Sequence, residues 1–308
     1  MFEGIGRSVV GVGAPDSSGR WLQWGMETTL EGACLCGTVR WRFDRQPSSV
    51  VNCHCTVCRR HHGGSYATFA VGSRDGFRWL AGEDAVRRWA RSPGFERAFC
   101  AHCGVKVPAH AGEEVRMPAG NFGAGYVRAP ELHAFAASRA PWIALDDGLP
   151  AYDAFPPGKH GTPAPSPVSD LEPGAVGGAC LCGAVAWQVD GPPLKMYHCH
   201  CERCRKARGS AFATNVFYAF DAFRWRRGEE RVSRYALPGA RFFGTASCRD
   251  CGAAVPRPQR DRGVAVVAAG SFDVDPGIRP SAHIYVGSSA GWDRIHDPLP
   301  RYPEGPPA

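Results

Sequence analysis

Fourteen cysteines are the residues of this chain most suited to chemistry, and they fall into short, closely spaced groups. Eight of them form two sets of four, each made of one C-x-C-G and one C-x-x-C-G motif. A Gly after the second cysteine lets the backbone turn through positive φ and direct its amides at sulfur, as in a zinc knuckle. Two such knuckles supply four thiolates, the closed arrangement of structural zinc, although iron also suits four sulfurs. The predicted ligands are Cys34, Cys36, Cys100 and Cys103 in the first set, and Cys180, Cys182, Cys248 and Cys251 in the second.

The other six cysteines form two sets of three, each in a C-x-C-x-x-C motif with no Gly after the last cysteine. They are Cys53, Cys55 and Cys58, and Cys199, Cys201 and Cys204. Three thiolates can bind one zinc ion and leave a position open to an outside ligand, which is the catalytic pattern. Such a thiolate-rich metal polarises water poorly, but it can hold an incoming thiol as the nucleophilic thiolate. The expected chemistry is addition of a small thiol to a carbonyl, or the reverse cleavage of a carbon–sulfur bond.

A histidine is the alternative fourth ligand that would close these three-cysteine sites. His61 and His62 are placed to do so in the first set, but the second set has no histidine at the matching positions. His54 and His200 are shared, yet each lies between two cysteines, where an extended chain points it to the opposite side. An open three-thiolate site is therefore the leading interpretation.

Basic residues directly follow the third cysteine of each set. They are Arg59 and Arg60 in the first set, and Arg205 and Lys206 in the second. Charge-assisted hydrogen bonds from these side chains can receive the carboxylates of a thiol substrate, and solvated surface charge is the alternative interpretation. Two other recurring pairs are assigned to structure: His133 and His283 to local hydrogen bonds, and Trp142 and Trp292 to the core.

These motifs occur twice because the chain contains an internal repeat. The segment 32–37 reappears 146 residues later, and the shift grows to 148 at Cys248 and to 150 at His283. Two insertions of two residues account for this drift, as expected of loops. Each copy carries seven cysteines in register, so the sequence predicts a duplicated domain.

Strand-like alternation dominates each copy. Val39, Trp41 and Phe43 alternate with arginines, and the same face recurs at 185–189. Val264–Ala268 and His283–Val286 are predicted as further strands. Helical periodicity is limited to short stretches, namely Glu83–Ala90 and the residues after the third cysteine of each three-cysteine set. The predicted fold is mainly β, with two tandem domains of mostly antiparallel strands held around metal.

The expected organisation is an N-terminal extension over 1–26, a first domain over 27–152, a linker over 153–176 and a second domain over 177–303. The linker has six prolines and three glycines in 24 residues, which is typical of an extended, semi-rigid spacer. Met26 directly precedes the patterned region and is a possible true start.

The composition of the chain restricts its fold class, its location and its partners further. With 38 Gly and 26 Pro in 308 residues, a helical bundle is excluded. No secretory signal and no long apolar run are visible, so we expect a cytoplasmic protein without a membrane span, in which clustered cysteines bind metal rather than form disulfides. The formal charge of +7 falls to about +1 once thiolate-bound zinc is counted, because four-sulfur and three-sulfur sites carry about −2 and −1. No acidic or nucleic-acid partner is therefore expected.

Taken together, the motifs resemble the glutathione-dependent formaldehyde-activating (centromere protein V-like) domain family, over both copies and about four-fifths of the chain. The resemblance implies a β-tent fold with a structural zinc on each four-cysteine set and a labile catalytic zinc on each three-cysteine set, about four per chain. It also implies a carbon–sulfur lyase-type activity, the condensation of glutathione or a related thiol with formaldehyde or another small aldehyde.

Two features depart from that family. Its characterised enzymes have one domain, whereas this chain is a tandem, so one copy can have changed specificity or become structural. The copies also differ in a loop, with Asn121-Phe122-Gly123 in the first and Ser271-Phe272-Asp273 in the second, and this difference can change which thiol or aldehyde fits. The alternative functions are a non-catalytic zinc-stabilised binding module and a zinc storage or sensing protein. The oligomeric state is not predicted.

Overall fold

The structure is a computed structural model, and it describes residues 29–90, 96–123, 125–126, 128–159 and 170–306 together with the backbone of 12–15 and 21–23. The predicted N-terminal extension and the centre of the predicted linker therefore lie largely outside the described residues. Strands β1 (Val12–Pro15) and β2 (Trp21–Gln23) pair antiparallel. No helix in the described ranges combines the length and apolar character needed to cross a membrane.

The first copy consists of short strands and one short helix. Its elements are β3 (Leu30–Ala33), β4 (Arg40–Phe43), β5 (Ser49–Cys53), α1 (Thr56–His62), β6 (Ala67–Ser73), β7 (Phe77–Ala81), β8 (Val86–Ala90), β9 (Glu96–Cys100), β10 (Ala109–Ala111), β11 (Glu114–Pro118), β12 (Leu132–Ala134) and β13 (Ala151–Tyr152). They form a three-stranded sheet β3–β4–β7, a hairpin β8–β9 and a six-stranded sheet β10–β11–β6–β5–β12–β13. Most strands pair antiparallel, and β12 pairs parallel with both β5 and β13.

The second copy repeats this arrangement. Its elements are β14 (Val176–Ala179), β15 (Ala186–Val189), β16 (Lys195–Cys199), α2 (Glu202–Arg208), β17 (Ala213–Ala219), β18 (Phe223–Arg227), β19 (Val232–Ala236), β20 (Gly244–Cys248), β21 (Arg257–Gln259), β22 (Val264–Ala268), β23 (His283–Ile284) and β24 (Arg301–Tyr302). The sheets are β14–β15–β18, β19–β20 and β21–β22–β17–β16–β23–β24. The predicted mainly β, mostly antiparallel fold with two sheet-rich halves is therefore confirmed.

The alternation predicted around β4 and around its counterpart in the second copy, β15, is also confirmed. Val39, Trp41 and Phe43 are buried, and so are the matching Val185 and Trp187. The same residues show why the strands form, since every second side chain enters the core while the arginines between them face outward.

Two predicted elements differ from the structure. The helical stretch Glu83–Ala90 is wrong, because only Glu83–Ala85 forms a 3-10 turn and the remainder is β8. The acidic residues at its start suit a helix N-terminus, but pairing with β9 takes the backbone groups of Val86–Ala90 instead. The strand predicted at His283–Val286 covers only two residues, since Tyr285 turns the chain with φ of 58° and a 3-10 turn follows.

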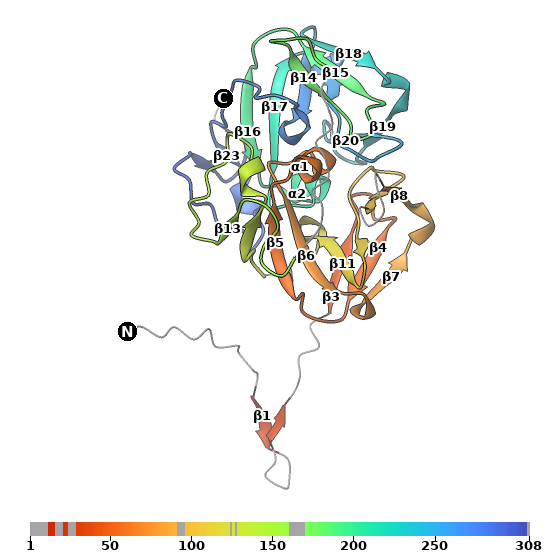
Figure 1. Cartoon of the computed structure of the whole chain (residues 1–308), viewed down its shortest axis with the longest axis vertical. Helices are drawn as coiled ribbons and strands as arrows, with labels where there is room; N and C mark the ends of the chain where they lie inside the picture. The colour runs from red at the N-terminus through yellow and green to blue at the C-terminus, as the bar shows by residue number, and fades with distance from the viewer. Residues whose placement is uncertain are drawn as a thin grey trace.

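The two copies interlock at the centre of the molecule, where Figure 1 shows α1 and α2 between the lower and upper halves. Helix α1 packs against η7 (Ala269–Ser271) of the second copy, and α2 packs against η3 (Ala119–Asn121) of the first. The helices also meet at their C-terminal ends, where His62 Nδ1 lies 2.7 Å from the carbonyl oxygen of Arg208, its counterpart in the repeat.

Each copy also contributes a tryptophan to the other's hydrophobic core. Trp292 packs with the buried core around Trp41, and Trp142 packs with the core around Trp187. The prediction that both tryptophans are core residues is confirmed. Trp142 Nε1 additionally donates to Ser65 Oγ at 2.8 Å. The two cores therefore depend on each other.

Gly270 is required by this interlock, because a Cβ atom there would overlap the carbonyl oxygens of Gly64 and Arg59 in the other copy. We expect Gly270→Ala to lower the free energy of unfolding by about 1–3 kcal/mol, the usual cost of overpacking. Chemical denaturation measures this loss. Gly125→Ala is the control, since a Cβ atom at Gly125 meets nothing within 4 Å. Equal stabilities of the two variants would contradict the interpretation.

Candidate functional site

The two four-cysteine sets each form one cluster, with all four sulfur atoms within 4.8 Å of one another. The Sγ atoms of Cys34 and Cys36 are 3.4 Å apart, and those of Cys36 and Cys100 are 3.8 Å apart. A tetrahedral zinc ion with Zn–S bonds of about 2.3 Å places its sulfurs about 3.8 Å apart, so the donor set fits zinc. The second copy matches, with separations of 3.4 Å and 3.7 Å.

Tight turns position these cysteines in the way that the sequence predicted. Gly37 and Gly104 follow the second cysteine of their motifs and have φ of 76° and 67°. Gly183 and Gly252 repeat this in the second copy with 79° and 68°. The backbone amide of Val39 donates to Cys34 Sγ at 3.3 Å, as expected for amides directed at metal-binding sulfurs.

The two three-cysteine sets lie where a strand meets a helix. In the second copy Cys199 ends β16, Cys201 is the N-cap of α2, and Cys204 lies in the first turn of that helix. The three sulfur atoms are within 4.8 Å of one another, and those of Cys199 and Cys201 are 3.6 Å apart. The first copy places Cys53, Cys55 and Cys58 in the same positions.

Each three-cysteine cluster favours a thiolate at one position. Hydrogen bonds from Cys199 and Cys204 lower the pKa of Cys201 to about 2. In the first copy, hydrogen bonds from Cys53 and Cys55 hold the pKa of Cys58 well below its ordinary value. A group of sulfurs that is already partly ionised is suited to bind a cation.

Histidine is absent from both clusters in the described ranges. His54 Nε2 lies 2.8 Å from His133 Nδ1 and His200 Nε2 lies 2.8 Å from His283 Nδ1, so both rings point away from the sulfurs, as the alternation of the strand predicted. The prediction that His133 and His283 serve local hydrogen bonds is confirmed by these contacts. His61 and His62 are buried, and burial lowers the pKa of His62 to about 4. Among the described residues, each cluster thus consists of three cysteine sulfurs without a fourth protein ligand.

The basic residues named from the sequence do not surround a common cavity. The expectation is wrong for Arg60, which is buried, forms an ion pair with Asp273 at 2.5 Å and donates to the carbonyl oxygen of Ala179 at 2.9 Å. The loop that carries Asp273 thus holds the two copies together. Lys206 pairs with Glu202 at 2.9 Å, in the i, i+4 geometry of an exposed helix face.

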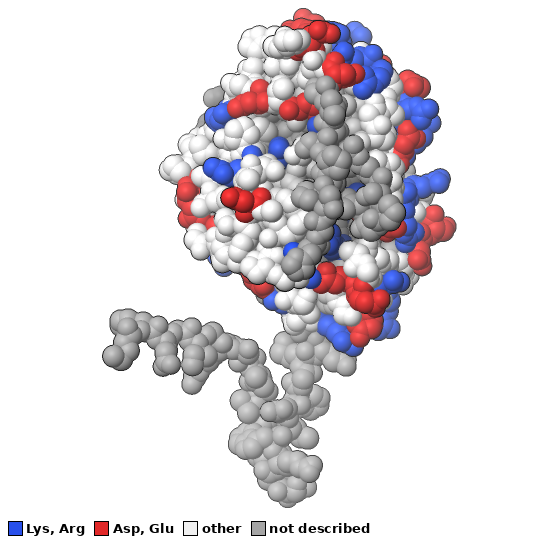
Figure 2. All heavy atoms as spheres, viewed as in Figure 1, with Lys and Arg blue, Asp and Glu red and all other residues white. Residues whose placement is uncertain are grey.

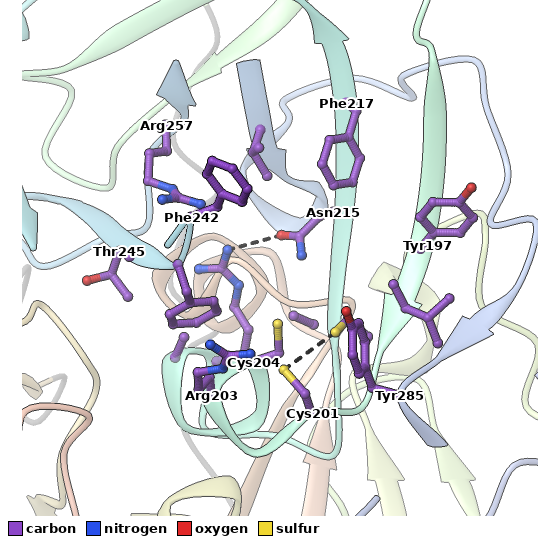
Figure 3. A pocket seen from close by; sticks show the side chains of 18 of the residues that line it. Tyr197, Cys201, Arg203, Cys204, Asn215, Phe217, Phe242, Thr245, Arg257 and Tyr285 are labelled. Atoms are coloured by element: carbon purple, nitrogen blue, oxygen red, sulfur yellow. Dashed lines mark hydrogen bonds between the residues drawn. The ribbon is translucent and has the colours of Figure 1, made fainter. Parts of the chain in front are cut away.

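A cavity of about 460 Å³ opens over the second three-cysteine cluster, and neither Arg205 nor Lys206 lines it. Figure 3 shows Cys201 and Cys204 at one end of this pocket, Arg203 and Arg257 on one side, and Tyr285 on the other. The three cysteines of the cluster all line the cavity. A small molecule in it therefore has direct access to the sulfurs.

Arginines that the sequence reasoning missed surround this cavity. They are Arg203, Arg208, Arg241, Arg257 and Arg262, and Lys195 joins them. No carboxylate of the described chain lies within 4.0 Å of any of them. Arginines on the outer surface differ, since Figure 2 shows acidic and basic groups interspersed along the right edge of the molecule. The exposed Arg231, for example, pairs with Asp250 at 2.8 Å.

Local spacing contained a signal for two of these arginines. Arg203 lies between Cys201 and Cys204, and Arg208 follows Cys204 by one helical turn. The others come from distant segments. Burial lowers the pKa of Arg257 to about 10, so this guanidinium stays charged at neutral pH while it is poorly solvated. The cavity therefore presents uncompensated positive charge to an incoming ligand.

At the corresponding place in the first copy the structure describes only part of the lining, because 91–95, the counterparts of 239–243, lie outside the described residues. The described residues there line a small cavity of about 20 Å³, and none of Cys53, Cys55 and Cys58 is among them. Larger side chains lie there, since His61 stands at the position of Ala207 and Arg97 at the position of Thr245. Arg97 Nη2 lies 3.7 Å from Cys58 Sγ. The two copies thus share a cluster but differ in the side chains that lie near it.

Comparisons with known proteins agree with the geometry. A model of the family described as "Glutathione-dependent formaldehyde-activating enzyme" (GFA) matches residues 29–138 and 175–288. The chain belongs to the GFA family. The resemblance seen in the cysteine motifs is confirmed, and each copy matches the family separately.

One curated relative shares part of its sequence with this GFA-family chain. A Halomonas elongata protein named "Putative glutathione-dependent formaldehyde-activating enzyme" is 37% identical over 81 residues, which are 24% of this chain and 51% of the relative. The chain thus spans about half the length of that relative. A solved structure of a Rhodobacter sphaeroides protein is 17% identical, with a TM-score of 0.25, over 40% of this chain and 99% of the other.

Proposed function

We propose that this protein is a zinc-dependent, carbon–sulfur lyase-type enzyme that acts at the Cys199, Cys201 and Cys204 cluster. Its substrates would be a small anionic thiol, such as glutathione, and formaldehyde or another small aldehyde. The observation that carries this proposal is a substrate-sized cavity with three cysteine sulfurs at one end and five arginines without carboxylate partners around it. Family membership and the printed name of the Halomonas relative support the substrate class.

The reaction needs no oxidant or reductant. A bond forms between the thiol sulfur and the carbonyl carbon, the π bond of the carbonyl breaks, and the proton of the thiol ends on the former carbonyl oxygen. The product is an S-hydroxyalkyl adduct, and the reverse direction cleaves its carbon–sulfur bond. A zinc ion held by the three cysteines would supply a site where the substrate sulfur binds as a thiolate, its nucleophilic form.

The arginines orient the substrate. Glutathione carries two carboxylates, and a guanidinium binds a carboxylate through two parallel hydrogen bonds. Aromatic rings hold two of the guanidinium groups in place. The Cζ atom of Arg203 lies 5.4 Å from the ring centroid of Phe243, and that of Arg241 lies 4.7 Å from the ring centroid of Phe242. A thiol fixed by its carboxylates reaches the cluster with its sulfur already oriented, which lowers the entropic cost of the reaction.

A comparison of an anionic thiol with a neutral thiol tests whether the arginines bind the carboxylates of the substrate. We expect Arg257→Gln combined with Arg203→Gln to raise the KM for glutathione about 10–100-fold, because lost charge-assisted hydrogen bonds cost about 1.5–3 kcal/mol. The KM for 2-mercaptoethanol, which has no carboxylate, should stay nearly constant. Exchange NMR between free and hydroxymethylated thiol measures both reactions. Arg234→Gln is the control, because Arg234 pairs with Glu229 at 2.9 Å on the surface.

Two results would contradict the proposal. One is a wild-type protein, loaded with zinc, that accelerates adduct formation with neither thiol. The other is an equal loss with the charged and the neutral thiol, which would assign the arginines to stability rather than to substrate binding.

A further inference from the structure

A second cavity, of about 260 Å³, lies between the two copies and is lined by residues of both. It is separate from the site proposed for catalysis, since no cysteine of the described chain lines it. Two histidines and one aspartate of the second copy, His198, His283 and Asp297, line this cavity together. Their ligand atoms lie within 4.8 Å of one another.

Strand pairing brings these three side chains together. His198 lies directly opposite His283 in the parallel pair β16–β23, and their ring centroids are 4.9 Å apart. Asp297 reaches the same point from the loop before β24, with its Oδ1 2.9 Å from His283 Nε2. Two ligands at right angles on a metal with bonds of about 2.1 Å lie about 3.0 Å apart, so this spacing suits a shared metal ion.

Both rings are oriented by a hydrogen bond on their other nitrogen, as is usual for metal-binding histidines. His198 Nδ1 lies 2.8 Å from Thr214 Oγ1, which leaves Nε2 without a hydrogen-bond partner in the described chain. His283 Nδ1 lies 2.8 Å from His200 Nε2. A metal ion would bind His198 Nε2 and would take the place of the contact of His283 Nε2 with Asp297, whose oxygens lie 2.9 Å and 3.0 Å away.

The first copy shows the same network in a form that needs no metal. His54 Nε2 lies 2.8 Å from His133 Nδ1, and His133 Nε2 lies 2.9 Å from Asp147 Oδ2. Two neutral imidazoles carry two N–H groups, which is enough for these two contacts. At the position of His198 the first copy has Asn52, whose Oδ1 accepts from Thr68.

In the second copy the same network has one contact more than two neutral rings can satisfy. Asp293 stands where the first copy has Ile143, and its Oδ2 lies 3.0 Å from His200 Nδ1, without hydrogen-bond alignment. Asp293, His200, His283 and Asp297 now form a row with three contacts, two of them to carboxylates and one between the rings, but two neutral rings still supply only two N–H groups. A cation between His283 Nε2 and Asp297 removes this shortage of N–H donors. His283 Nδ1 can then donate to His200 Nε2, and His200 Nδ1 can donate to Asp293.

We propose that His198, His283 and Asp297 bind a divalent transition-metal ion, with its remaining positions facing the cavity between the copies. Two imidazoles and one carboxylate are the ligand set of mononuclear non-haem iron and related divalent sites. Asp293 and His200 act as positioning residues, since they fix the tautomer of His283. The site does not depend on the proposed lyase activity, and only the second copy carries it.

Cobalt(II) binding to the zinc-loaded protein tests this site. Native mass spectrometry counts the ions, and absorption distinguishes the ligands, because cobalt on cysteine gives intense thiolate charge-transfer bands and cobalt on nitrogen and oxygen does not. We expect the wild type to bind one ion without charge-transfer bands. His198→Asn and Asp297→Asn should lose that ion or bind it at least 10-fold more weakly.

Matched variants keep this test independent of folding. His198→Asn introduces the residue that the first copy already accommodates as Asn52, and Asp147→Asn removes the matching carboxylate of the first copy. Asp147→Asn should leave the cobalt count unchanged. Equal cobalt counts in the wild type, His198→Asn and Asp297→Asn would overturn the proposal, as would an additional ion that shows thiolate charge-transfer bands.

Discussion

Cys201→Ser should abolish turnover, whereas the matching change in the first copy, Cys55→Ser, should leave most of it. Both residues cap a helix at a three-cysteine cluster, but Cys201 lines a cavity of about 460 Å³, whereas the cavity of about 20 Å³ at the corresponding place among the described residues of the first copy is lined by none of its cysteines. Serine keeps the shape and removes the thiolate that, in the proposed function, would help to hold the zinc ion. We expect a loss of at least about 100-fold in kcat/KM, or about 2.7 kcal/mol of transition-state stabilisation.

Exchange NMR with glutathione and formaldehyde measures this difference, and native mass spectrometry provides the control. Cys201→Ser should lose one exchangeable zinc ion while both four-cysteine sites stay loaded. The double variant Cys55→Ser/Cys201→Ser should be inactive as well. Full activity of the double variant would show that the three-cysteine clusters are not the reaction site. Equal losses in the two single variants would show instead that both copies take part.

Asp273→Asn should be the most destabilising single substitution at the contact between the copies. Asp273 and Arg60 are about 3% and 2% exposed, and their side chains pair at 2.5 Å. Removing one charge leaves the other buried without compensation, which typically costs about 3–5 kcal/mol. Urea denaturation measures the loss, and the midpoint should fall without loss of zinc from the folded protein.

A surface ion pair supplies the control for this prediction. Asp190→Asn removes the partner of Arg224, which lies 2.7 Å away with both side chains about half exposed, and should cost less than about 1 kcal/mol. Replacing both buried partners by apolar residues, as in Arg60→Met/Asp273→Leu, should restore much of the lost stability. A loss at Asp273→Asn no greater than that at Asp190→Asn would show that the buried pair does not stabilise the contact.

The sequence by itself determined the cysteine clusters, because their geometry is set locally. A cysteine followed by a Gly in positive φ, or three cysteines at a strand-to-helix junction, form part of a site within six residues. The alternation of Val39, Trp41 and Phe43 likewise predicted a strand, since one buried face of a sheet imposes a period of two. The internal repeat then predicted the same strands and cysteine clusters in the second copy.

Only the tertiary structure decided which residues surround each cluster. Arg60 follows a cysteine as a substrate-binding residue would, yet the second copy buries it against Asp273. Glu83–Ala90 has a helical pattern, but pairing with β9 makes most of it a strand. Arg257 and Arg262 reach the cavity from strands and turns far along the chain from the cysteines.

The two copies likewise have the same local sequence motifs but differ in their tertiary packing. Their cysteine motifs are the same, but the side chains at matching positions near the clusters differ, with His61 and Arg97 in the first copy where the second has Ala207 and Thr245. His198 and His283 meet because β16 and β23 pair in register, a contact between residues 85 positions apart. Spacing along the chain fixes what a few neighbouring residues can bind. Access and charge depend on packing between distant segments, and only the folded chain determines them.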